Sequence, residues 1–392
     1  MNISILLKKQ TALLLFALLW GGTSTAVPLC ENALTTKPPS QTLSIKERLS
    51  LVDTTPSLPL SRMLDQMKAD GRLLYQGTHQ YKPGTEFLAS NEFDWLATPF
   101  DNQSADVLIA FGTNSAWEIA VNKNVKRLYL ADWSPYPLLT SAYLITPLIR
   151  IAKTPHHFIT LLSGRVPNKN LEQMPLDDLF LEARQYTTKS SPDKTKNTRA
   201  FLQYLASQKI SDFELEFLTS YFWALNQSPT QSQSFGPFQN IRSSSFARIL
   251  NFYDQRYSPS AVSLQNSVDS ALDLLARHSV FSSQTNFAKL RTLFVNGNVQ
   301  YAMTSITDLN LYQNILLKEK KRGSQSYALS ITNIFDCDYA GLSETALFNY
   351  MFEMRQLFST PDNPLIVFRT IHTQPPHLFH RYVLEAKEKG AW

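Results

Sequence analysis

Apolar and polar positions form distinct blocks along the chain, and the clearest block lies between residues 106 and 132. Val107–Phe111 is a continuous apolar run, as expected of a strand that is buried on both faces of a parallel sheet. A turn at Gly112 follows, helical apolar spacing begins near Ala116, and a second apolar run over 126–131 ends at Asp132. This order predicts the strand, turn, helix and strand of a nucleotide-binding half-sheet, with the acid about 20 residues beyond the turn.

The same kind of pattern returns in the last third of the chain, where runs with strand and helix character alternate. We predict helices over 285–295, 309–320 and 343–358, strands over 299–303, 327–332 and 365–369, and an antiparallel edge strand over 379–384. Alternation of this kind predicts an α/β fold with a doubly wound, mostly parallel sheet.

The chain between these two parts has a different pattern. From about 150 to 280, parallel-strand runs are missing and helical spacing occurs over 171–185, 199–208 and 212–225, with polar stretches between. We therefore predict a large helical insertion (151–280) between the second and third strands. It separates the two halves of a Rossmann-like core, 101–150 and 281–392, and an N-terminal arm with a helical layer occupies 27–100.

The N-terminus has the features of a secretory signal peptide. Lys8-Lys9 precedes an apolar run over 11–20 that is too short to span a membrane, and small residues up to Ala26 suit cleavage there. We predict removal of 1–26 and an exported, periplasmic or secreted protein with no other membrane span; an uncleaved anchor and lipidation at Cys30 are the alternatives. Cys30 and Cys337 form a disulfide or stay unpaired, and both outcomes remain open.

Charge and motifs narrow the functional classes. The net charge is +5, and the dense basic cluster over 318–322 is interrupted by Glu319, so a solvated helix end explains it better than a nucleic-acid surface. We expect no nucleic-acid partner. The sequence contains no Gly-x-Ser-x-Gly elbow, Walker loop, His-Glu-x-x-His or Cys-x-x-Cys motif.

Taken together, residues 100–150 and 285–372 resemble the core of class I S-adenosylmethionine-dependent methyltransferases. They also resemble a family of exported bacterial proteins of uncharacterised activity that carry such a core, in the blocks Val299–Asp308, Ser330–Asp338 and Arg369-Thr370. The resemblance implies S-adenosylmethionine as a candidate cofactor.

The resemblance also implies a role for each site residue. Gly112, Thr113 and Asn114 would approach the methionine portion of the cofactor, and Asp132 would bind its ribose hydroxyls. Trp133 and Asp308 would contact the adenine. Thr332 and Asn333 would border the methyl group that is transferred. The chemistry suits these roles, because a carboxylate accepts hydrogen bonds from two hydroxyls and a glycine lets the backbone approach a ligand closely.

A second group of candidate residues stands at the predicted ends of the fourth and fifth strands. Asp336, Asp338 and His372 could converge in one cleft and suit acid–base catalysis or a metal site, or they could be a loop cap and a surface histidine. We predict acid–base catalysis and no metal. The spacing of His372, His377 and His380 also resembles a set of metal ligands, but Pro375-Pro376 prevents these histidines from sharing a helical face.

These features lead to one expectation about function and two alternatives. We expect an exported protein with a methyltransferase-like fold that binds a small ligand or has lost catalysis. The alternatives are a functional methyltransferase and a module that uses the inserted helices to hold a protein or envelope partner, whose identity the sequence does not specify.

Overall fold

The computed structural model describes residues 103–111, 114–132, 135–188, 193–227, 279–304, 306–331, 344–371 and 378–384. The predicted signal peptide, the N-terminal arm and the two cysteines lie outside the described residues. Of the described residues, 344–354 belong to one compact unit and all the others to a second unit, which contains the sheet.

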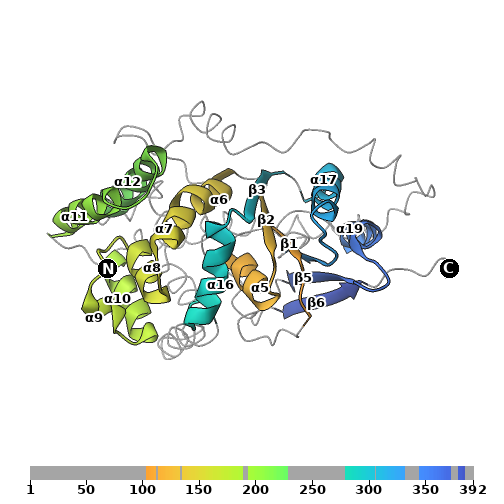
Figure 1. The fold of residues 1–392 in the computed structure, drawn as a ribbon, viewed down its shortest axis with the longest axis horizontal. Coiled ribbons are helices and arrows are strands. Elements are labelled where there is room, and N and C mark those ends of the chain that lie inside the picture. Colours follow the sequence, from red (N-terminus) through yellow and green to blue (C-terminus); the bar gives the residue numbers. More distant parts are fainter. Residues whose placement is uncertain are drawn as a thin grey trace, which may run out of the picture. The chain divides into compact units, whose positions relative to one another are not determined.

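The sheet of the second unit has the strand order β3-β2-β1-β4-β5-β6 (Figure 1). Strands β1 to β5 are parallel to one another, and β6 is antiparallel to β5. This confirms the predicted α/β fold with a mostly parallel sheet, and it is compatible with a Rossmann-like core. The strands are β1 Val107–Phe111, β2 Arg127–Asp132, β3 Val299–Met303, β4 Tyr327–Ser330, β5 Leu365–Ile371 and β6 Leu378–Leu384.

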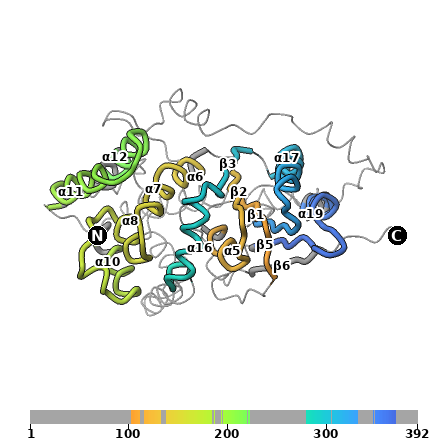
Figure 2. The backbone as a smooth tube through the Cα atoms, in the orientation of Figure 1, coloured from red at the N-terminus to blue at the C-terminus, as the bar shows by residue number. Residues whose placement is uncertain are grey.

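Strand β1 is the centre of this sheet and all five of its residues are buried. It pairs with β2, which follows it closely in the chain, and with β4, which comes some 220 residues later, so early and late segments lie side by side (Figure 2). A strand that is paired on both sides and covered on both faces must be apolar throughout, which explains the uninterrupted run in the sequence.

Alternate residues of the strands face two separate helical layers. Leu108 aligns with Leu128 and Ala328, and these three join one large core with α5 (Asn114–Asn122) and α16 (Gln284–Val295). Phe111 and Tyr129 lie on the opposite face and contact side chains of α17 (Leu309–Lys320), which Figure 1 shows on the other side of the strands from α5 and α16.

All the regular elements described between β2 and β3 are helices. In chain order these helices between β2 and β3 are α6 Pro135–Thr140, η2 Ser141–Ile145, α7 Thr146–Ile151, α8 Pro155–Leu162, α9 Lys169–Glu172, α10 Leu176–Thr188, α11 Lys194–Ala206, α12 Asp212–Gln227 and α16. None of the helices in the described residues has the length and apolar character needed to cross a bilayer.

The predicted boundaries of these helices were partly wrong. The helix predicted over 171–185 is interrupted between α9 and α10, where Pro175 cannot donate the backbone hydrogen bond of a continuous helix. Helix α11 starts at Lys194, within the polar stretch that was expected to separate helices. Helix α8 was not predicted, although Thr154 caps it by accepting a hydrogen bond from His157 N (3.0 Å) and Pro155 occupies its first turn.

Helices α6 and α7 are joined through the π-helical segment η2. Pro147 has no N–H to donate to the carbonyl of Tyr143, and the Thr146 N–H bonds to Ser141 O, five residues earlier. The Thr146 hydroxyl also donates to Ser141 O (2.8 Å) and lies 3.0 Å from the hydroxyl of Tyr301 on β3. The wide turn is therefore held against the sheet by side-chain hydrogen bonds.

Glu118 is an ionisable side chain buried in the layer that covers the first face of the sheet. Glu118 of α5 is only 5% exposed, and its Oε1 accepts a hydrogen bond from Val280 N at 2.8 Å, just before α16. Burial raises the pKa of Glu118 to about 8, and this one hydrogen bond offsets only part of the shift. The side chain is therefore mostly a neutral acid at pH 7.

We predict that Glu118 makes the folded state less stable as the pH rises. The unfolded chain releases the proton near pH 4.5 whereas the folded chain retains it up to about pH 8, so the free energy of unfolding falls across that window, by on the order of 5 kcal/mol. Glu118→Gln keeps an acceptor for Val280 N–H but cannot ionise, so its stability should change much less with pH. Urea unfolding at several pH values measures the difference.

Glu172→Gln is the matched control, because this exposed glutamate at the end of α9 is hydrated in both states. It should retain the pH dependence of the parent protein. Equal pH dependence in Glu118→Gln and the parent would contradict the assignment to Glu118.

Candidate functional site

The carboxyl ends of the parallel strands form one edge of the sheet, and the strand order reverses there. After β1 the chain builds β2 and β3 on one side, and later it adds β4 and β5 on the other side. In open α/β sheets, ligands bind outside the carboxyl ends of the strands at such a reversal. This edge is therefore the candidate site. The site residues predicted from the sequence follow the strands at this edge.

At the end of β1 the side chain of Phe111 is directed into the protein. It is buried, and its ring centroid lies 6.4 Å from that of Tyr312 on α17. Tyr312 is itself fully buried and donates a hydrogen bond to Ile306 O at 2.9 Å. Phe111 thus fixes the end of β1 beneath α17, just before the predicted ligand-binding turn.

The two acids predicted to hold a nucleoside follow neighbouring strands, since Asp132 ends β2 and Asp308 comes after β3, directly before α17. Asp132 is the last residue of β2 and is partly exposed, and its backbone carbonyl accepts a hydrogen bond from Thr304 N at 2.8 Å. The Thr304 hydroxyl in turn donates to Oδ2 of Asp308 at 2.7 Å. Thr304, just after β3, therefore connects the two candidate positions, and sequence reasoning missed it because an isolated threonine carries no distinguishing pattern.

Asp308 also has a structural role. It is the N-cap of α17, where its Oδ1 accepts a hydrogen bond from Asn310 N at 3.1 Å while Oδ2 accepts from Thr304. The side chain is buried. Helix capping therefore explains this acid without a ligand, and the adenine contact implied by the resemblance remains a prediction.

The structure describes three of the predicted site residues: Asp132, Asp308 and Asn114, which is the first residue of α5. Within the ranges that the structure covers, no group of three or more His, Cys, Asp or Glu side chains could hold a metal ion. The remaining candidates lie outside the described residues: Gly112, Thr113, Trp133, Thr332, Asn333, Asp336, Asp338 and His372.

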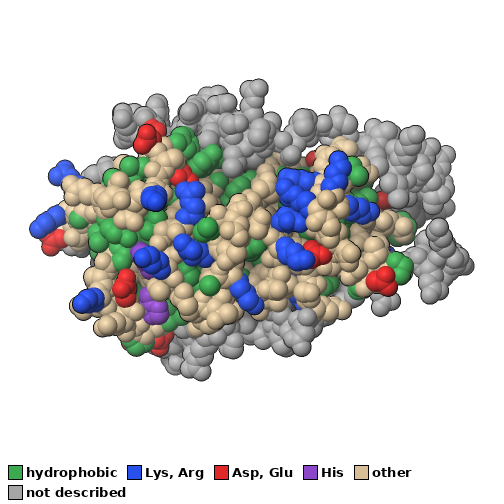
Figure 3. Space-filling view, in the orientation of Figure 1, with side chains coloured by type: hydrophobic (Ala, Val, Ile, Leu, Met, Phe, Trp, Pro, Cys, Tyr) green, Lys and Arg blue, Asp and Glu red, His purple; other side chains and the backbone are tan. Residues whose placement is uncertain are grey.

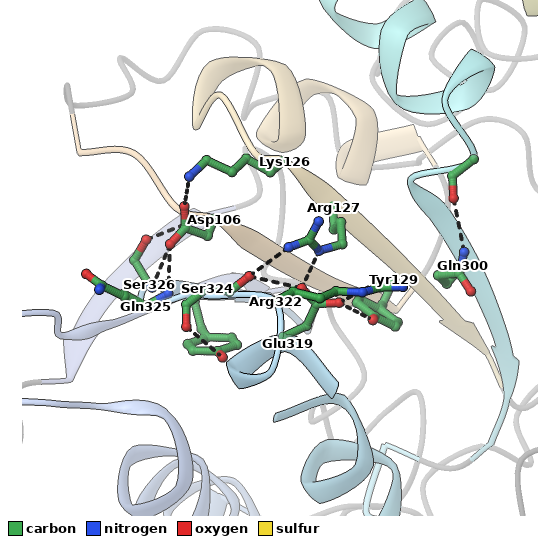
Figure 4. Close-up of polar contacts among 12 residues, drawn as sticks. Asp106, Lys126, Arg127, Tyr129, Gln300, Glu319, Arg322, Ser324, Gln325 and Ser326 are labelled. Carbon is green, nitrogen blue, oxygen red and sulfur yellow. Dashed lines mark hydrogen bonds and ion pairs between the residues drawn. The ribbon is translucent and has the colours of Figure 1, made fainter. Parts of the chain in front are cut away.

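The opposite, amino edge of the sheet contains a dense network of charged and polar groups around Glu319 (Figure 4). The Glu319 side chain is fully buried at the end of α17 and accepts hydrogen bonds on both oxygens. On Oε1 the donors are Tyr129 OH (2.6 Å) and Arg322 Nη1 (2.9 Å), and on Oε2 they are Arg127 Nε and Ser324 Oγ (3.0 Å).

This network determines the ionisation of Glu319. Burial alone would raise the pKa of its carboxyl, but the hydrogen bonds from Tyr129, Arg127, Ser324 and Arg322 outweigh burial and lower it. Burial and the neighbouring carboxylate also raise the pKa of Tyr129, which keeps its hydroxyl a donor at neutral pH. The result is a fully satisfied ionic cluster that joins α17 to β2.

Asp106 makes a second connection on the same edge. Its carboxylate accepts hydrogen bonds from Lys126 Nζ (2.8 Å) and from the backbone N–H groups of Gln325 (2.8 Å) and Ser326 (3.2 Å). Burial would raise its pKa, but these hydrogen bonds and the lysine charge lower it to about 2. The amino edge is therefore held together by ion pairs that fix β1, β2 and β4 in register.

Comparison with known proteins does not assign the chain to a family. No model of a known protein family matches the chain, and no curated protein sequence is similar to it. The function is therefore argued from the strand order and from the side chains at the two edges.

We predict that Asp308→Ala lowers the free energy of unfolding by about 1–2 kcal/mol, because it removes an N-cap together with the acceptor of the Thr304 hydroxyl. Asp308→Asn keeps an oxygen at the capping position and should lose less than half as much. Chemical unfolding followed by circular dichroism measures both changes.

Asp177→Ala is the control, because Asp177 is an exposed acid in the first turn of α10, where it contributes only through the helix dipole. Its effect should stay below about 0.5 kcal/mol. If Asp308→Ala costs no more than this control, Asp308 is not a stabilising cap.

Proposed function

We propose that the protein binds a small ligand with a nucleoside part at the carboxyl edge of the sheet, beside β1 and β2. The observation that carries the proposal is the position of Asp132, which is the last residue of the strand next to the central β1, on the side to which the chain first turns. In nucleotide-binding sheets, an acid at this position accepts hydrogen bonds from ribose hydroxyls.

The exposure of the two acids supports different roles for them. Asp132 is partly exposed, whereas Asp308 is buried and its two oxygens accept hydrogen bonds from Thr304 and Asn310. Asp132 is therefore the proposed ligand contact, and Asp308 holds the start of α17 beside it.

The resemblance to class I methyltransferases makes S-adenosylmethionine the first ligand to test. In this proposal the nucleoside lies across the ends of β1 and β2, and Gly112, Thr113, Asn114 and Trp133 complete its site. We propose binding as the primary role, with catalysis reduced or lost, because the large buried ring of Phe111 occupies the position just before the turn that approaches the cofactor. An active methyltransferase is the alternative.

Calorimetric titration with S-adenosylmethionine and S-adenosylhomocysteine tests the proposal. We expect micromolar binding, and Asp132→Asn should weaken it at least tenfold, because hydrogen bonds to a charged acceptor contribute about 1.5–3 kcal/mol. Adenosine alone should bind more weakly but should show the same dependence on Asp132.

Asp362→Asn is the matched control, since this exposed aspartate lies before β5, at the amino edge of the sheet. It should leave binding unchanged. Absence of heat at millimolar concentrations of all three ligands would refute the nucleoside proposal. Equal weakening by both variants would refute the role of Asp132.

A further inference from the structure

The solvent face of α17 presents basic side chains together with one leucine. The buried positions of this helix are Leu309, Leu311, Tyr312, Ile315 and Glu319, and its last turn is exposed at 317, 318 and 320. Lys321 and Arg322 continue the exposed basic segment beyond the end of the helix. The sequence pattern correctly indicated an exposed helix end, but Glu319 is directed inward.

The buried Glu319 brings a second basic segment to this surface. Arg127 of β2 and Arg322 both donate to its carboxylate, so the start of β2 lies against the end of α17. Lys126, next to Arg127, is mostly exposed even though it pairs with Asp106. Two segments almost 200 residues apart in the chain therefore form one surface.

We name this surface the basic patch, and it carries an excess of positive charge. Its six bases are opposed by Glu319 and Asp106, which leaves an excess of four positive charges among the described residues. Figure 3 shows Lys and Arg side chains gathered over α17 and the neighbouring strands. The bases of the patch are Lys126, Arg127, Lys318, Lys320, Lys321 and Arg322.

Leu317 adds an exposed apolar side chain to the basic patch. It is 60% exposed, more than any other large hydrophobic side chain in the described residues. Lys320 and Lys321 follow it by three and four residues, the spacings that place side chains on one side of a helical turn. A single exposed leucine is ordinary on a protein surface, but a leucine on the same helical turn as exposed lysines combines the two interactions that hold a protein at an anionic bilayer surface.

We infer that the basic patch docks on anionic phospholipid headgroups, with Leu317 entering the interface between headgroups and acyl chains. Each basic residue near such a surface contributes about 1 kcal/mol, and burying the leucine adds an apolar term. The leucine favours a lipid surface over nucleic acid, which offers phosphates but no comparable apolar layer. This contact is peripheral and uses the amino edge of the sheet, away from the proposed ligand site.

Flotation of the full chain with phosphatidylcholine vesicles, with and without roughly 30% phosphatidylglycerol, tests the inference. We expect binding to the anionic vesicles at about 0.1 M salt and its loss at about 0.5 M, where charges are more strongly screened. Lys320→Glu/Lys321→Glu should reduce the partition coefficient at least tenfold, and Leu317→Ser about fivefold. The apolar N-terminal run is common to all variants, so it cannot produce these differences.

Lys196→Glu/Arg199→Glu is the matched control, since it changes two exposed bases on α11 by the same charge. It should retain binding, and an unchanged thermal midpoint in every variant excludes loss of the fold. The inference is overturned if the protein binds both kinds of vesicle equally, or if Leu317→Ser has no effect on binding. It is also overturned if the α11 variant loses as much binding as Lys320→Glu/Lys321→Glu. Tighter binding to a fluorescein-labelled DNA duplex than to the vesicles would assign the patch to nucleic acid instead.

Discussion

The structure depends on the pairing of β1 with two strands from distant parts of the chain. Its five buried residues align with β2 on one side and with β4 on the other. Because every backbone group of a buried strand needs a partner, β1 cannot be stable until the segment some 220 residues later has returned to it. This pairing also creates the reversal of strand order at which a ligand site is expected.

The strands could be predicted because a strand that is buried on both faces is an uninterrupted apolar run in the sequence. The apolar runs of β1 and β2, and the end of β2 at Asp132, were predicted, as was the antiparallel pairing of β6 with β5. The helices between β2 and β3 were predicted less well because their boundaries depend on single caps and prolines. Thr154-Pro155 before α8 and Pro175 before α10 are local signals of this kind, and periodicity averages over them.

Side-chain roles were harder to predict than strands, because they depend on partners that the chain brings from elsewhere. Glu319 stands among lysines and an arginine, so the sequence suggests full hydration, yet Arg127 and Tyr129 of β2 surround it. Glu118 did carry a usable signal, since it is the only charge in the apolar run Ala116–Val121 of α5. A lone acid in such a run indicates burial and therefore a raised pKa.

The carboxylates at the two edges of the sheet are held in different ways. At the amino edge, Glu319 and Asp106 each accept several hydrogen bonds from cations or backbone N–H groups, which holds them ionised and fixes the strands in place. At the carboxyl edge, Asp308 has two donors from its own loop and helix, while Asp132 remains partly exposed. The ion pairs at the amino edge therefore help to keep β1, β2 and β4 in register, and this register sets the position of Asp132 at the other end of β2.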